Sequence, residues 1–113
     1  MSYDVALENA DGSLCVMPEP VAKGGTYALG DTFECDFNIT YNYAEVFGSL
    51  VRDLHGKSAG DTEAGLQAFV DAWPHAKPYR ENYWAPTPGN AKAAIEVLLT
   101  FAKQHPDGVW RVS

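Results

Sequence analysis

The stretch that decides the fold is TFECDFNITYNYAEVFGSLV, residues 32–51, because the spacing of its apolar residues changes part-way along. Between Phe33 and Ile39 apolar and polar side chains alternate, which predicts a strand over residues 32–40 with one face in the core. Farther along, the apolar side chains recur at intervals of three and four, which predicts an amphipathic helix. Asn42 and Glu45 have the spacing of a capping box, so we expect this helix to begin near Asn42.

Shorter strands are predicted on the N-terminal side of that stretch. Alternation of apolar and polar side chains over residues 3–8 predicts a first strand, and the turn residues NADG (9–12) follow it. SLCVM (13–17) predicts a second strand that forms a hairpin with the first. We expect PEP (18–20) to end that strand, because proline cannot donate to a ladder. TYAL (26–29) is a further candidate for a short strand.

Two more helices are predicted in the C-terminal half. Apolar residues from Leu66 to Trp73 are spaced three and four apart, so the second helix should begin at Asp61 or Thr62 and stop at Pro74. An irregular loop rich in proline and aromatic residues follows. A threonine before a proline then predicts the start of the third helix, since proline suits the first helical turn. The segment GVWRV (108–112) predicts a short last strand or a packed tail.

Together these elements predict a single α+β domain over residues 1–113. A small antiparallel sheet, made of the N-terminal strands and a possible C-terminal strand, would pack against three helices. A chain of 113 residues can bury one core but is short for two.

The charge of the chain is uneven along its length. The net charge is −7, and residues 1–40 hold seven acidic residues against one basic residue. Such a chain does not attract phosphates, so we expect no direct nucleic-acid binding. The acidic N-terminal part could contact a basic partner or a cation, or could only keep the protein soluble. No apolar run is long enough to span a membrane and no signal-peptide pattern is visible, so the expected location is the cytosol.

Two segments carry the side chains most suited to binding. In NITYNY (38–43) amide and aromatic side chains adjoin a helix start, which suits an anion, a carbonyl, a base or a sugar ring, although a simple strand–helix joint explains most of them. In YRENYWAPTPGN (79–90) aromatic residues and arginine, which dominate interface hot spots, precede a helix; they could also fold back over the core. The predicted binding residues are Asn38, Tyr41, Tyr43, Arg80, Tyr83, Trp84 and Asn90.

Patterns for catalysis and for metal binding are few. Glu34, Asp36 and Asn38 offer oxygen ligands at a spacing of two, but a solvated strand face explains them more simply. The three histidines lack the spacing of a zinc site, and each lies near a predicted helix end. Cys15 and Cys35 are expected to be reduced and packed, although both fall in predicted strands and a bridge is geometrically conceivable. We therefore predict no catalytic residue, no metal and no cofactor.

The segments TYALGDT, NITYNY, YWAPTPGNA and HPDGVW resemble stretches of small hypothetical proteins from bacterial and bacteriophage genomes. The resemblance covers most of the chain from Gly24 onward. It implies a small cytosolic accessory protein, with a prophage as one origin that fits. That group has no assigned activity, so no functional residue is carried over.

The sequence favours binding over catalysis. The first interpretation is an accessory protein that contacts a protein partner through its acidic N-terminal part and its aromatic loop. The alternative is a binder of a small, nucleotide-like ligand, with a pocket between residues 38–43 and 79–90. A third interpretation, an enzyme, requires acidic side chains or histidines to converge in a cleft. The oligomeric state is left open.

Overall fold

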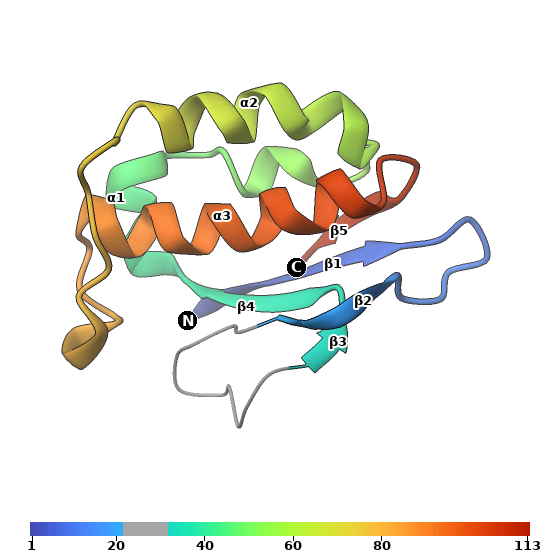
Figure 1. The fold of residues 1–113 in the computed structure, drawn as a ribbon, viewed down its shortest axis with the longest axis horizontal. Helices are drawn as coiled ribbons and strands as arrows, with labels where there is room; N and C mark the ends of the chain where they lie inside the picture. Colours follow the sequence, from blue (N-terminus) through green and yellow to red (C-terminus); the bar gives the residue numbers. More distant parts are fainter. Residues whose placement is uncertain (22–31) are drawn as a thin grey trace.

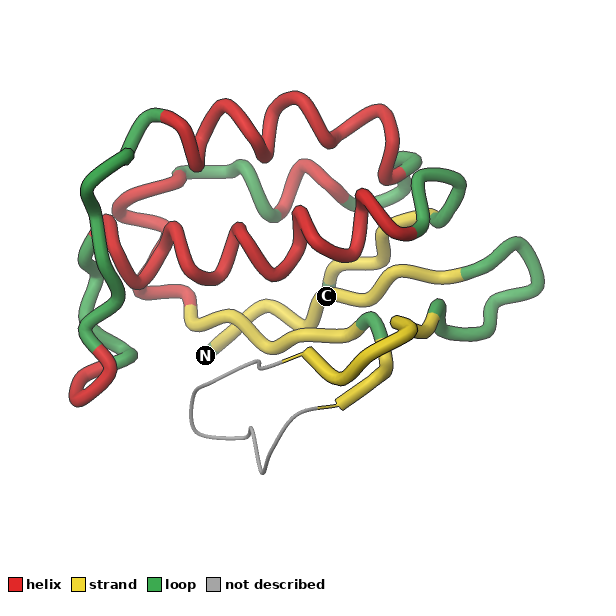
Figure 2. Tube along the Cα trace, in the orientation of Figure 1, coloured by secondary structure: helices red, strands yellow, loops and turns green. Residues whose placement is uncertain are grey.

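Five strands and three helices, joined by short 3₁₀ turns, make up the described part of the chain (Figures 1 and 2). The computed structural model describes residues 1–21 and 32–113, except for the side chain of Arg80. The strands are β1 (Ser2–Glu8), β2 (Val16–Val21), β3 (Thr32–Glu34), β4 (Asp36–Thr40) and β5 (Val109–Val112). The helices are α1 (Ala44–Phe47), α2 (Ala59–Asp71) and α3 (Pro88–Gln104), and the 3₁₀ turns are η1 (Tyr41–Tyr43), η2 (Arg52–Leu54) and η3 (Arg80–Asn82). The strand predicted over residues 26–29 lies outside the described residues.

β1 is the middle strand of a three-stranded antiparallel sheet, with β4 on one side and β5 on the other. Its side chains Tyr3, Val5 and Leu7 are buried, and α3 lies over this face of the sheet (Figure 1). β2 and β3 form a separate two-stranded sheet. The prediction of an α+β domain with a small antiparallel sheet and three helices is therefore confirmed, and the predicted last strand is β5.

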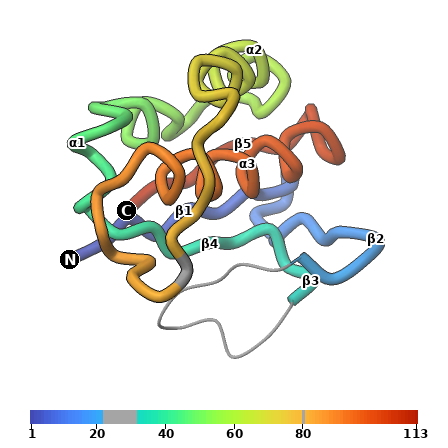
Figure 3. The backbone as a smooth tube through the Cα atoms, turned by 60° about the vertical axis from the view of Figure 1, so that its left-hand side comes forward, coloured from blue at the N-terminus to red at the C-terminus, as the bar shows by residue number. Residues whose placement is uncertain are grey.

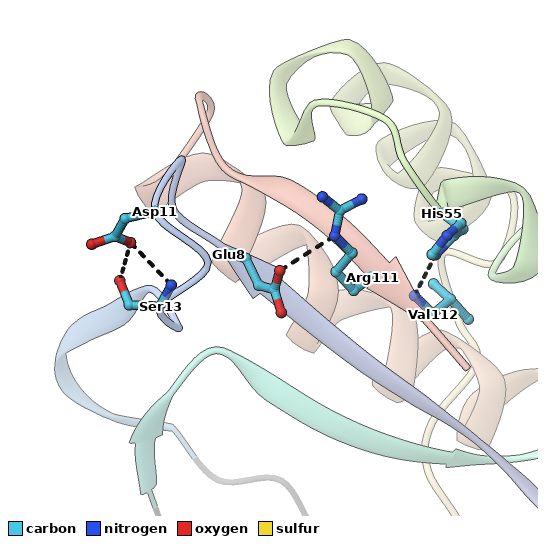
Figure 4. Close-up of polar contacts among 6 residues, drawn as sticks. All are labelled: Glu8, Asp11, Ser13, His55, Arg111 and Val112. Atoms are coloured by element: carbon cyan, nitrogen blue, oxygen red, sulfur yellow. Dashed lines mark hydrogen bonds and ion pairs between the residues drawn. The ribbon is translucent and has the colours of Figure 1, made fainter.

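Trp110 ties β5 to the helical layer. Its side chain is fully buried, and its indole N–H donates a hydrogen bond of 2.8 Å to the hydroxyl of Thr62 on α2. The outer edge of β5 is covered by the segment before α2, because Trp110 N–H donates to the Lys57 carbonyl at 3.0 Å. Next to it, the Val112 N–H donates to Nδ1 of His55 at 3.0 Å (Figure 4). This sheet edge therefore has few backbone groups left for another strand.

The strand predicted over residues 32–40 is two strands, so that prediction was wrong in one respect. Cys35 separates β3 from β4, and the two pair with different partners. The Cys35 N–H donates to the Cys15 carbonyl at 2.9 Å, whereas its own carbonyl accepts from the Leu7 N–H at 2.8 Å. The chain changes sheet at this residue, and Phe33, expected in the core, is 48% exposed.

The prediction that PEP ends the second strand was also wrong. β2 passes through both prolines and pairs with β3, and the predicted hairpin with β1 is reduced to a single bridge between Glu8 and Leu14. Val16 pairs with Glu34 and Val21 with Thr32, so the β2 side holds extra residues between its two paired positions. The prolines lie in this bulge, where no ladder hydrogen bond is required of them.

The first predicted helix is shorter and more broken than expected. The first turn begins after Thr40, whose hydroxyl accepts from the Asn42 N–H, so Asn42 is not the cap. Gly48, with a φ of +61°, ends α1, and only a 3₁₀ turn follows. α2 begins at Ala59, two or three residues before the predicted start at Asp61 or Thr62, and Trp73 lies beyond its end. The third helix is as predicted, with Thr87 as its cap and Pro88 as its first residue.

Candidate functional site

The loop between α2 and α3, residues 72–87, runs down one end of the molecule beside α1 (Figures 1 and 3). It brings the two predicted binding segments together. Asn42 Nδ2 donates a hydrogen bond of 2.9 Å to the Trp84 carbonyl, and the Tyr43 hydroxyl donates to the Tyr83 carbonyl. These contacts join segments about forty residues apart, and they bind the loop backbone to the first helical turn.

Asn90 holds the loop from the other side. Its side chain is 4% exposed and makes three hydrogen bonds to loop backbone. Oδ1 accepts from the Tyr79 N–H at 2.7 Å, and Nδ2 donates to the carbonyls of Asn82 and Ala85 at 3.0 and 3.1 Å. Both polar atoms of this side-chain amide are therefore hydrogen-bonded within the protein. Asn90, predicted as a binding residue, supports the loop rather than facing a ligand.

The start of α3 is packed tightly against the same loop. The Thr87 hydroxyl accepts from the Asn90 N–H at 3.1 Å, which caps the helix. Gly89 is buried, and a Cβ at this position would lie 1.7 Å from the carbonyl oxygen of Lys77. Only glycine allows the loop backbone to approach the helix this closely. The loop backbone is thus held by the first helical turn on one side and by the start of α3 on the other.

Three aromatic side chains stand out from this fixed loop. Tyr79 is 52% exposed, Trp84 is 50% exposed, and Trp73 is 37% exposed. We refer to these three side chains as the aromatic surface. The Trp84 ring meets the Tyr83 ring edge-on, with centroids 5.0 Å apart, and Lys92 Nζ donates to the Trp73 carbonyl at 2.8 Å. The aromatic rings are therefore held on a supported backbone while between about a third and a half of their surface faces solvent.

The remaining predicted binding residues lie elsewhere or serve the core. Tyr43 is buried, and desolvation, followed by the nearby Tyr83, raises the pKa of its hydroxyl above the usual value. Tyr41 packs against Tyr3 with ring centroids 4.5 Å apart. Asn38 lies on the sheet, where its Nδ2 donates to Ser2 and Asp4 side-chain oxygens at 2.8 and 2.7 Å. The side chain of Arg80 is not among those described.

Tyr79 and Trp73 were missing from the predicted set, although both contribute to the aromatic surface. Trp73 was assigned to the buried stripe of the second helix because its spacing continues that of Leu66 and Phe69. The helix ends at Asp71, so the periodicity no longer applies at Trp73. The proline that follows Trp73 was the signal that could have placed it outside the helix.

A cavity of about 320 Å³ lies at another place, between the turn after β1 and the end of α3. It is lined by Asn9, Ala10 and residues 104–108. The turn is stabilised by Asp11, whose carboxylate accepts from the hydroxyl and N–H of Ser13 at 2.6 and 3.0 Å (Figure 4). These bonds lower the pKa of Asp11 below its usual value. Neither predicted binding segment reaches this cavity.

Two of the three histidines considered for catalysis are engaged in structural contacts. His105 Nε2 lies 2.6 Å from the Val16 carbonyl, and His55 accepts from β5 as described above. Within residues 1–21 and 32–113, no three His, Cys, Asp or Glu side chains are grouped so that they could hold a metal ion. Cys15 is buried and its Sγ donates to Asn9 Oδ1 at 3.3 Å. Desolvation, and then the charge of Glu8, raises the pKa of this thiol.

Comparison with protein-family models, with curated protein sequences and with solved structures gives no match for this chain. Among the described residues, no helix is both long enough and apolar enough to cross a membrane.

Proposed function

We propose that this chain is a protein-interaction module that binds a partner through its aromatic surface. The observation that carries the proposal is that Tyr79 and Trp84, each about half exposed, stand on a loop fixed by Asn90. Large aromatic side chains supply much of the binding energy at protein interfaces. A loop of this length with little regular secondary structure is usually functional or disordered, and hydrogen bonds hold this one in place.

The fixed backbone matters because binding otherwise costs conformational entropy. Ordering a flexible loop and its side chains on association consumes part of the interaction energy. Here the side chains of Asn42, Tyr43 and Asn90 already hold the loop backbone in the free protein. The cost of ordering the loop backbone is therefore met during folding, which favours binding through this surface.

The alternative of a small-ligand pocket between residues 38–43 and 79–90 has less support. Asn42 and Tyr43 bond directly to the loop backbone, and Asn90 is saturated by the loop. An enzymatic function has less support still, because His55 and His105 are bonded to backbone groups. In line with the resemblance to small bacterial and bacteriophage proteins, the partner would be a host or phage protein.

A capture experiment with paired variants tests the proposal. Wild type, a Tyr79→Ala/Trp84→Ala variant and a Phe33→Ala variant would be immobilised and exposed to lysate from the source cells. Phe33 is the matched control, since it is 48% exposed but belongs to the separate β2–β3 sheet. We expect one protein that is retained by wild type and by Phe33→Ala but lost with the double variant. The purified partner should then bind wild type about 30-fold or more tightly than the double variant, as expected for hot-spot residues. Equal binding by all three proteins would reject the proposal.

A further inference from the structure

The stretch of sequence that carries the aromatic surface has a net charge opposite to that of the rest of the chain. Residues 73–92 contain three basic residues, Lys77, Arg80 and Lys92, and one acidic residue, Glu81, a net charge of +2. Since the whole chain carries −7, the other residues carry −9. The exposed aromatic side chains therefore lie within a basic stretch of a strongly acidic chain.

The fold adds to this local charge. α3 begins beside the loop and has no acidic residue in its first turn, so its positive N-terminal end is not neutralised by its own side chains. Lys92 is anchored to the same surface, because its Nζ donates to the Trp73 carbonyl at 2.8 Å. Lys77 is exposed, and its backbone is packed against Gly89 at the start of α3. These cationic groups are therefore carried by the loop that bears the aromatic rings and by the helix start packed against it.

We infer that the occupant of the aromatic surface is a short acidic peptide segment of the partner protein that also carries apolar side chains. The inference rests on the proposed function and names the chemistry of its partner. Apolar side chains of such a segment would pack on Tyr79 and Trp84, and its carboxylates would face Lys77 and Lys92.

A short segment fits better than a nucleic acid, which also combines negative charge with rings that stack. A nucleic-acid strand extends well beyond one patch, and the −9 charge of the remaining chain would repel its phosphates. A peptide of limited length meets only the basic stretch.

A displayed library of random peptides supplies the test. Wild type and Trp84→Ala would each be used for selection, and only peptides enriched by wild type alone would be counted. We expect these peptides to carry a net negative charge together with aromatic or aliphatic residues. One enriched peptide, labelled with a fluorophore, would then be titrated against charge variants and followed by anisotropy.

The charge variants are Lys77→Glu and its control Lys103→Glu. Both lysines are exposed, and Lys103 lies at the opposite end of α3. Lys77→Glu should weaken binding of the peptide about three- to tenfold, and Lys103→Glu should change it less than about twofold. The weakening should become smaller as salt is raised.

The outcomes separate this inference from the proposed function. Enrichment of neutral or basic peptides that depends on Trp84 would overturn the acidic partner and leave the interaction module in place. Absence of any enrichment that depends on Trp84 would overturn both. Tighter binding of oligothymidylate than of the acidic peptides would overturn the peptide assignment. Self-association in sedimentation that is lost with Trp84→Ala would instead identify a second copy of the chain as the occupant.

Discussion

Replacing Asn90 by alanine should destabilise the protein strongly while leaving the helix start intact. The side chain makes three hydrogen bonds to the loop and is 4% exposed. A hydrogen bond of this kind contributes about 1 kcal/mol, so the three together contribute about 3 kcal/mol. Alanine is the better helix former by about 0.5 kcal/mol, which offsets part of the loss. We therefore expect the free energy of unfolding to fall by about 2.5 kcal/mol.

The assay is urea unfolding at 25 °C, followed by tryptophan fluorescence, with Asn42→Ala as the control. Asn42 is exposed and makes one side-chain hydrogen bond to the loop, so its replacement should cost about 0.5–1 kcal/mol. Asn90→Asp should be at least as destabilising as Asn90→Ala. It keeps an acceptor for the Tyr79 N–H but turns a carboxylate oxygen toward the carbonyls of Asn82 and Ala85.

Hydrogen exchange gives a second, local reading of the same prediction. The Tyr79 amide should exchange much faster in Asn90→Ala than in the wild type, because its acceptor has been removed. If Asn90→Ala lost less than about 0.5 kcal/mol and kept the Tyr79 amide protected, the loop would not depend on this clamp. The aromatic surface would then not be pre-organised for binding.

Three further predictions concern packing and ionisation. Gly89→Ala should destabilise the protein by about 3 kcal/mol or more, since its Cβ would lie 1.7 Å from the Lys77 carbonyl oxygen. Gly65→Ala, at a position in α2 with open space around it, should stabilise the protein by about 0.5–1 kcal/mol. Thermal unfolding measures both effects, and equal effects would contradict the packing described for Gly89. Folding raises the pKa of Tyr43, so the stability that this group contributes should be complete below its unfolded-state pKa near 10. That contribution should decline as the pH rises through the folded-state pKa. Urea unfolding between about pH 9 and 11 should show the decline in wild type and a weaker one in Tyr43→Phe. The buried Cys15 thiol should react with a thiol reagent far more slowly in the native protein than in urea, and rapid native labelling in a Cys35→Ser background would show that this site is open.

The sequence was most informative where neighbouring residues are compatible with only one type of secondary structure. The start of the third helix could be predicted because a threonine cap, a proline and an apolar stripe all agree there. The α+β class followed in the same way from strand-like spacing at the N-terminus and helical spacing after it. β1 was likewise recognisable from its alternating residues, whereas residues 108–112 left a last strand or a packed tail open and form β5.

The errors arise where tertiary contacts overrule the local pattern. Alternation over residues 32–40 is compatible with one strand, and only the hydrogen bonds of Cys35 to two different partners divide it. The prolines of β2 are tolerated because the register of that pair is irregular. Both effects depend on residues distant in the chain, which a pattern read along one segment does not contain.

The candidate site was predictable in its location but not in the orientation of its side chains. The composition of residues 79–90 identified the loop, and its position beside residues 38–43 agrees with the juxtaposition that the ligand hypothesis required. The direction of each side chain was not predictable. Tyr43 and Asn90 point into the structure, and Trp73 is more exposed than its helical spacing suggested. Whether the loop binds anything stays a prediction.

The three tryptophans provide the most direct measurement of the central claim, which is that the aromatic surface binds a protein partner. Their exposures are 50% for Trp84, 37% for Trp73 and 0% for Trp110, so Trp110 is an internal control. The indole N–H signals of ¹⁵N-labelled protein would be recorded while the captured partner is added to saturation. We predict that the Trp84 signal shifts most, that Trp73 shifts less, and that Trp110 stays in place. A saturated complex in which the Trp84 signal is unchanged would contradict the account.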